Sequence, residues 1–147
     1  MMSRLSIAVS TFALISLSVA SFAQTTAARP AIADQEDYGA AMKEIAARSA
    51  ALRKSLGTTP SEADAAAAAA RLEAIFKNVQ AYWERKSVED AITQARKAVT
   101  AAQDVAKSLS IHDIQAATAA SQTLAGTCTS CHDAHRARLT DGFYKIK

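Results

Sequence analysis

The sequence predicts an all-α fold, an antiparallel up-down-up-down bundle of four helices. The chain is rich in alanine and has only four glycines and two prolines in 147 residues, which favours long helices. Hydrophobic residues recur in alternating steps of three and four, the spacing of a helix that buries one face. Four such stretches follow one another with short breaks, and helices joined by short loops pack as antiparallel neighbours.

Residues 1–23 have the composition of a secretory signal peptide. Arg4 gives the positive start, the following run is mostly apolar but diluted by serine and threonine, and 21–23 is a small-x-small cleavage site. The run is short and serine-rich for a membrane span, which needs about 20 predominantly apolar residues. We therefore expect export to the periplasm and no integral membrane association after cleavage, with an uncleaved N-terminal anchor as the alternative.

Residues 34–147 form one predicted domain, and residues 24–33 form a flexible lead-in to it. The first helix is expected over 34–56, because Asp34 can cap its start and Gly57 marks its end. Its inward positions are Tyr38, Met42, Ile45, Ser49, Leu52 and Leu56.

The second helix is expected to open at Thr59-Pro60-Ser61-Glu62. In this interpretation Thr59 is the N-cap, Pro60 lies in the first turn and Glu62 completes a capping box. The alanine run at 65–70 favours the helix further. The buried stripe continues through Leu72, Ile75, Phe76, Val79 and Trp83.

The third helix is expected to be capped by Ser87 and Asp90, and the fourth begins near Asp113 and ends near Leu139. The residues after Leu139 are expected to be a short tail. The third buried stripe is Ile92, Ala95, Val99, Ala102, Ala106 and Leu109; the fourth is Ile114, Ala117, Ser121, Leu124, Cys128, Cys131 and His135.

The only two cysteines lie in the run Cys128-Thr129-Ser130-Cys131-His132. C-x-x-C-H is the pattern of a c-type haem attachment site. Residues three apart share a helix face, so both thiols can add to the vinyl groups of one haem while His132 binds its iron. We therefore predict one haem c, attached covalently through two thioethers.

Other uses of the same residues are less well supported by the sequence. A redox dithiol would be expected within a βαβ pattern, and no strand pattern is present. A structural zinc site needs four ligands at wider spacing than Cys128, Cys131, His132 and His135. A disulfide between the two cysteines stays open as an alternative, although it leaves the adjacent histidine unexplained.

Helix geometry places Met42 at the level of His132. At about 1.5 Å per residue, Met42 lies roughly 12 Å from the start of its helix, and His132 lies roughly 10 Å from the end of the last one. Those two ends meet in an up-down bundle. A haem pocket is therefore expected between the first and fourth helices. Its expected surroundings are Val79, Tyr82, Trp83 and Ile92, with Ala41, Ala91 and Ala95 leaving room for a flat ligand.

With these features the chain resembles the cytochrome c′ family, or class II cytochromes c, over the whole mature chain. The resemblance implies that Cys128 and Cys131 carry the haem and that His132 is the proximal iron ligand. The family has a basic residue four positions after this histidine, and Arg136 matches it as a haem-contacting residue. A low-spin subgroup has methionine at the position of Met42, which implies that its sulfur is the sixth iron ligand.

Two positions depart from the family pattern. His135 stands where the family usually has an aromatic residue, and Tyr38 stands where it has an arginine. His135 is expected either to lie near a haem propionate or to be a partly exposed residue at the end of the fourth buried stripe. His112, in the turn before the fourth helix, is expected to have a surface or capping role.

Histidine and methionine ligation suits electron transfer and leaves no open position on iron for chemistry. We therefore expect a periplasmic one-electron carrier, not an enzyme, that serves redox partner proteins outside the cytoplasm. The alternatives are a five-coordinate cytochrome c′ that binds gases such as nitric oxide, and a haem-free helical interaction module. The net charge is only +3 and no basic stripe is present, which argues against nucleic acid. By resemblance, two copies are expected to pair through their first two helices.

Overall fold

The computed structural model describes residues 31–57, 59–140 and 144–147. The predicted signal peptide at 1–23 and most of the lead-in lie outside these residues. The elements, in chain order, are α1 (Gln35–Ser55), α2 (Glu62–Lys86), α3 (Glu89–Ser110), α4 (Ile114–His135), β1 (Arg136–Arg138) and β2 (Tyr144–Ile146). An all-α domain of four helices is thus confirmed, with a small hairpin added at its end.

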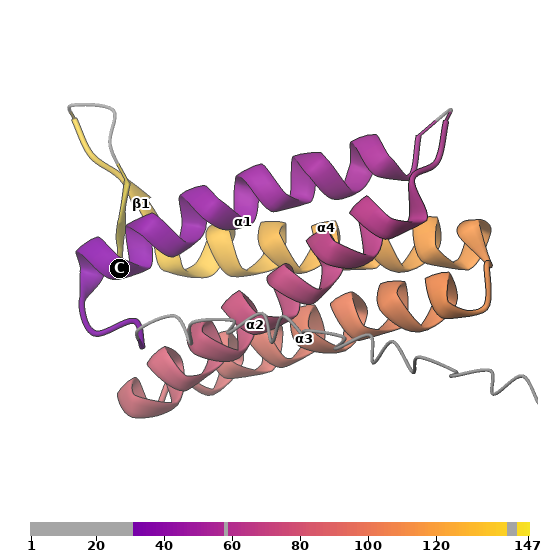
Figure 1. Ribbon diagram of the computed structural model, residues 1–147. Coiled ribbons are helices and arrows are strands. Elements are labelled where there is room, and N and C mark those ends of the chain that lie inside the picture. The colour runs from indigo at the N-terminus through magenta and orange to yellow at the C-terminus, as the bar shows by residue number, and fades with distance from the viewer. Residues whose placement is uncertain (1–30, 58, 141–143) are drawn as a thin grey trace, which may run out of the picture.

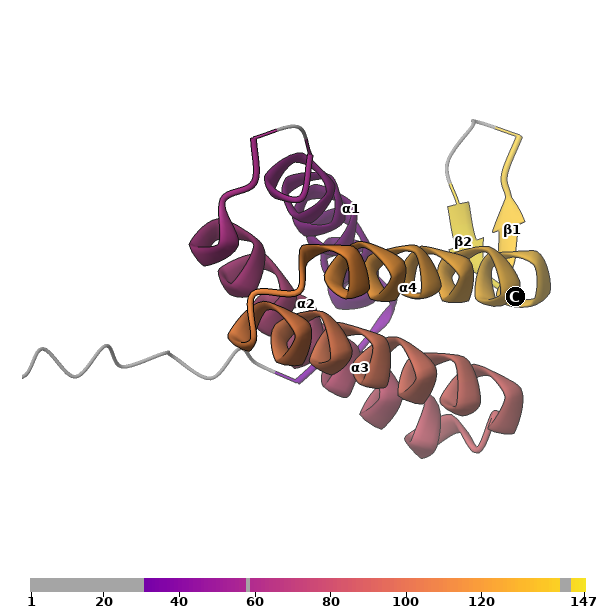
Figure 2. The same cartoon turned by 90° about the vertical axis from the view of Figure 1, so that its right-hand side faces the viewer.

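Each helix packs mainly on the next one along the chain. The α2–α3 and α3–α4 interfaces are long, α1 lies on α2, and α1 touches α4 over a short stretch only. Figure 1 shows the chain turning back at each link, and Figure 2 shows the hairpin standing at the C-terminal end of α4. None of the helices in the described part of the chain has an apolar stretch long enough to cross a membrane.

Two helix starts follow the sequence prediction closely. The Asp34 carboxylate accepts a hydrogen bond from the backbone N–H of Asp37 at the start of α1. The Asp113 carboxylate does the same for Ala116 at the start of α4, at 2.8 Å. Both are N-cap hydrogen bonds, which satisfy backbone donors that a helix leaves unpaired in its first turn.

The start of α2 differs from the prediction. Ser61, not Thr59, is the N-cap, and its hydroxyl bonds to the Asp64 carboxylate instead of a backbone N–H. The reason is a contact with the preceding helix: the backbone N–H of Ser61 donates to the carbonyl of Ser55 at 2.9 Å. This bond holds residue 61 against the end of α1, so Pro60 stays in the link.

Ser87 also has a different role from the one expected. It is the C-cap of α2 and adopts the left-handed conformation, with φ 55° and ψ 41°, while Val88 is the N-cap of α3. A left-handed residue after the last turn is a common way to end a helix. The two helices therefore meet in a tight turn with no side-chain cap on α3.

The C-terminal residues differ most from the prediction. α4 ends at His135 instead of near Leu139, and the expected tail forms β2, which pairs antiparallel with β1. The backbone N–H of Lys147 donates to the carbonyl of His135, and Ile146 packs against the core. The hairpin therefore folds back onto the end of α4.

The chain just before α1 is also attached to the bundle. Ile32 is buried, and its carbonyl accepts a hydrogen bond from the guanidinium of Arg85. The N–H of Ala33 donates to the Asp37 carboxylate at 3.0 Å. The last residues of the predicted lead-in, 31–33, thus pack against α1 and α2.

Candidate functional site

A cavity of about 370 Å³ lies inside the bundle beside the Cys128–His132 run. All four helices contribute to it, and its lining is mostly apolar. The residues that matter here are Met42 and Ile45 from α1, Phe76 and Val79 from α2, Ala91 and Ala95 from α3, and Leu124, Cys128, Cys131 and His132 from α4.

A second cavity, of about 420 Å³, lies between α1, the end of α4 and the hairpin. Tyr38, Met42, Ala46, Cys131 and His132 line both cavities. These five side chains therefore form a shared wall, which we call the dividing wall.

The two cysteines both face the first cavity from the same side of α4. Each is half-buried, and neither is in a disulfide. The Cys128 thiol lies 3.7 Å from the carbonyl of Leu124, four residues earlier. Burial raises the pKa of both thiols, and at Cys131 the neighbouring Cys128 and Asp90 raise it further. A reactive redox dithiol shows the opposite shift, so this environment does not favour that alternative.

His132 presents a neutral imidazole. Burial, followed by the nearby positive charge of Arg136, lowers the pKa of its ring. In the part of the chain that the structure describes, neither ring nitrogen makes a hydrogen bond. A neutral imidazole with a free lone pair is the form that binds a metal.

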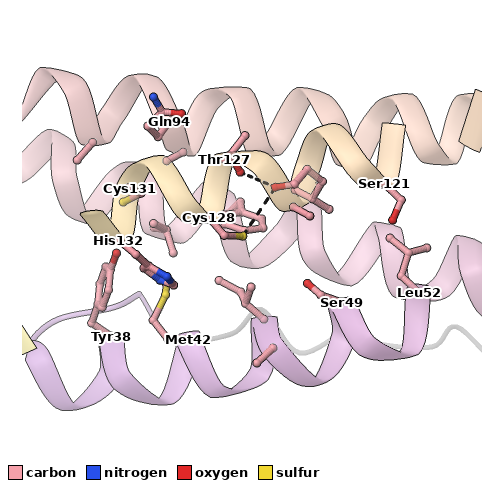
Figure 3. Close-up of a pocket in the computed structure, with 18 of the residues that line it drawn as sticks. Tyr38, Met42, Ser49, Leu52, Gln94, Ser121, Thr127, Cys128, Cys131 and His132 are labelled. Atoms are coloured by element: carbon pink, nitrogen blue, oxygen red, sulfur yellow. Dashed lines mark hydrogen bonds between the residues drawn. The ribbon is translucent and has the colours of Figure 1, made fainter. Parts of the chain in front are cut away.

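Within the dividing wall, Met42 faces His132. Figure 3 shows the Met42 side chain from α1 and the His132 ring from α4 pointing toward each other. The helix arithmetic therefore predicted their common level, as both side chains line both cavities. That Met42 binds iron stays a prediction.

Arg136 and His135 lie on the hairpin side of the site. Arg136 lines only the second cavity, and its backbone N–H caps α4 by donating to the carbonyl of His132. His135 Nε2 lies 2.8 Å from Asp90 Oδ2, and its ring centroid is 5.1 Å from that of Trp83. His135 thus ties the end of α4 to α3 and α2.

His112 lies far from this site, as expected. It is exposed, has a φ of 60° in the turn between α3 and α4, and its Nδ1 lies 2.7 Å from Glu62 Oε2. It therefore contributes a surface contact between that turn and the start of α2.

The surroundings of the pocket were predicted only in part. Val79, Ala91 and Ala95 line the first cavity, but Tyr82, Trp83, Ile92 and Ala41 are buried behind it and line neither cavity. The sequence did not indicate Arg53 or Gln94, which do line it. Arg53 is exposed and Gln94 is half-buried, and because both are polar, no hydrophobic pattern could have marked them.

A buried aromatic cluster supports the dividing wall from behind. The indole N–H of Trp83 donates to the hydroxyl oxygen of Tyr38 at 3.1 Å. The rings of Tyr38 and Tyr82 are 4.9 Å apart, and Trp83 meets both edge-on. Sequence reasoning placed these residues in the core but missed the bond, because it joins positions 45 residues apart.

Within the described ranges, no group of three or more histidine, cysteine, aspartate or glutamate side chains is arranged to hold a metal ion. This does not favour the zinc alternative. The residues present do fit a covalently attached haem: two thiols on one helix face that form no disulfide, a neutral imidazole beside them and an apolar cavity in front.

No family model matches the chain, and no curated protein matches it in sequence. Among solved structures, the chain is similar to a cytochrome c′ described as having an unusual ligand-controlled dimer dissociation. The match has a TM-score of 0.59 and 19% sequence identity, and it covers 76% of this chain and 93% of that one. At this identity the likeness establishes a shared fold.

Proposed function

We propose that this chain is an exported c-type haem protein that carries single electrons between partner proteins in the periplasm. The observation that supports it best is the dividing wall, where Cys131 and His132 of the α4 motif face Met42 of α1. The shared fold with a cytochrome c′ supports the same class of protein. The signal-peptide pattern at 1–23 supports export.

In this proposal each residue has one task. Cys128 and Cys131 would hold the haem through thioethers, and His132 of α4 and Met42 of α1 would bind its iron. A bound haem would supply an iron that takes up and releases one electron. The apolar lining excludes water, and histidine with methionine on iron favours a raised reduction potential. Because His132 and Met42 would both be bound to iron, we propose a carrier and not an enzyme.

The second candidate is a gas-binding haem protein. In that case Met42 shields the iron without binding it, and a small molecule such as nitric oxide reaches the open side. The specific observation in its favour is the cavity space on both sides of Met42. The electron carrier is preferred because Met42 is the one thioether outside the predicted signal peptide.

The attachment is tested on the full chain, exported in a host that ligates haem. We expect a mass increase of one haem that survives acid extraction, together with a pyridine haemochrome spectrum. The double variant Cys128→Ala/Cys131→Ala should lose this covalent mass, and Ser130→Ala should keep it. A colourless wild-type product with the mass of the bare polypeptide would refute the proposal.

We also propose that two copies pair through α1 and α2. Both helices carry exposed alanines that permit close approach, among them Ala40, Ala47, Ala63 and Ala67. The similar solved structure is itself described as a dimer that dissociates under ligand control. Sedimentation equilibrium of the haem-loaded protein tests this: a monomer at all concentrations would exclude pairing.

A further inference from the structure

The lining of the second cavity carries positive charge. Lys43 of α1, Arg136 of β1 and Lys145 of β2 line it, and none of the acidic side chains that the structure describes does. Lys43 and Lys145 are exposed, so their ammonium groups stand at the solvent side of the cavity. The opposite side is the dividing wall. The cavity therefore has an apolar interior and a basic mouth that includes the hairpin.

A buried hydrogen-bond donor lies on the wall of the same cavity. Tyr38 is 8% exposed, and its oxygen already accepts the indole N–H of Trp83. In the part of the chain that the structure describes, the O–H of Tyr38 has no acceptor of its own. Buried polar groups are almost always paired, so an acceptor from a bound molecule is the natural partner. Burial raises the pKa of Tyr38, which keeps this hydroxyl protonated as a donor.

We propose that the second cavity binds carboxylate groups, with the Tyr38 hydroxyl as hydrogen-bond donor and Lys43 and Lys145 as counter-charges. An ionised carboxylate can only accept hydrogen bonds, so it needs donors around it. The Tyr38 O–H and the two ammonium groups are such donors. The rest of the lining requires that the carboxylate be attached to an apolar body. The sequence analysis named Arg136 as a haem-contacting residue. It did not assign Lys43 or Lys145 to the site, and it did not predict the Tyr38 hydroxyl as a donor.

The preferred source of the carboxylates is the haem itself, and this assignment rests on the proposed function. Cys128 lines only the first cavity, Cys131 lines both, and the hairpin lines only the second. The second cavity thus extends away from Cys128 and toward the hairpin. A haem has its vinyl groups and its two carboxylates on different edges, so a molecule fixed at the cysteines can direct its carboxylates to this mouth.

The first experiment follows the ionisation of the haem carboxylates in the loaded protein, through the pH dependence of its reduction midpoint. A nearby cation or O–H donor favours the ionised carboxylate. Tyr38→Phe, Lys43→Gln and Lys145→Gln should each raise the proton affinity of a haem carboxylate by about three- to tenfold. Tyr82→Phe and Lys97→Gln are matched controls, since neither residue lines the first or the second cavity, and they should leave the profile unchanged.

The second experiment distinguishes the two sources of carboxylate by titrating acetate into the protein as purified, with calorimetry as the readout. If the haem carboxylates fill the mouth, loaded wild type binds no acetate. Acetate binding that Lys43→Gln and Lys145→Gln abolish would instead assign the mouth to free organic acids. If the pH profiles match the controls and acetate does not bind, the proposal is wrong. A colourless product would refute the proposed function, and the acetate titration would still test the cavity.

Discussion

Met42 is the residue on which the choice between electron carrier and gas binder depends. If its sulfur binds iron, Met42→Ala opens the sixth position, and the ferric visible spectrum should change from a low-spin to a high-spin form. Carbon monoxide should then bind the reduced variant at least about tenfold faster, because no protein ligand has to leave first. Stopped-flow absorbance measures this rate.

The matched control for Met42 is Ile45→Ala. Ile45 lines the same cavity one turn further along α1, so this variant enlarges the cavity without removing a sulfur. It should keep the wild-type spectrum. If Met42→Ala also keeps that spectrum, Met42 only shields the site, and the gas-binding alternative becomes the better interpretation.

The Asp90–His135 contact gives the structure a pH-dependent tie between α3 and α4. The hydrogen bond from His135 lowers the pKa of the Asp90 carboxyl below its ordinary value of 3.8. A carboxyl with a lowered folded-state pKa stabilises the fold above its unfolded-state pKa, and that contribution is lost as pH falls through the folded-state pKa. The ionised form of Asp90 is therefore the stabilising one.

The test of this tie is the difference in unfolding midpoint between wild type and Asp90→Asn. We expect the difference to be steady above the unfolded-state pKa of the Asp90 carboxyl and to shrink as the pH falls through its lowered folded-state pKa. Asp104→Asn, which removes an exposed carboxylate elsewhere on α3, is the control. A wild-type advantage that persists in strong acid would contradict the assigned role of Asp90.

At the scale of elements, the turn between α2 and α3 contains a residue in an unfavourable conformation. Ser87 has a φ of 55°, where a Cβ is strained and glycine is not. Ser87→Gly should therefore raise the free energy of unfolding by about 0.5–1 kcal/mol. Ala47→Gly, on the exposed side of α1, should lower it by about 1 kcal/mol. Urea denaturation followed by circular dichroism measures both changes; a destabilised Ser87→Gly would refute this reasoning.

The elements that the sequence predicted well are those whose signals are local. Asp34 and Asp113 cap their helices through bonds to residues three positions ahead, so four residues suffice to recognise each start. The start of α2 was wrong because a bond from Ser61 to Ser55 of the previous helix decides it. The hairpin was missed because strands of three residues are too short to show an alternating pattern.

In the candidate site, too, the features with local sequence signals were predicted and those that join separate elements were missed. The Cys128–His132 run needs only its own spacing, and Met42 needed only helix rise and topology to be placed opposite His132. The Tyr38–Trp83 bond and the basic mouth join positions on separate elements, and nothing in the local sequence marks them. Periodicity predicts which face of a helix is buried, but not which buried side chains meet.

At the scale of the whole molecule, the two cavities of about 370 and 420 Å³ lie where α1 and α4 face each other. The α1–α4 interface is smaller than the α1–α2, α2–α3 and α3–α4 interfaces, because α1 packs mainly on α2 and α4 packs mainly on α3. Side chains that line empty space lack packing partners, and this lowers the stability of a core. We therefore expect the closure of the bundle between α1 and α4 to depend on a bound group.

We accordingly expect the unloaded chain to be less stable than the haem-loaded one by on the order of 3 kcal/mol or more. The comparison uses guanidinium denaturation of the exported wild type and of Cys128→Ala/Cys131→Ala purified free of haem. Ser130→Ala, which is expected to keep its haem, controls for substitutions within the motif. The loss should be concentrated in α1, whose amide protons should exchange faster in the unloaded protein while those of the α2–α3 pair stay protected. Equal stabilities with uniform exchange would mean that the four helices close without a bound group, and the haem-free interaction module would then be the better interpretation.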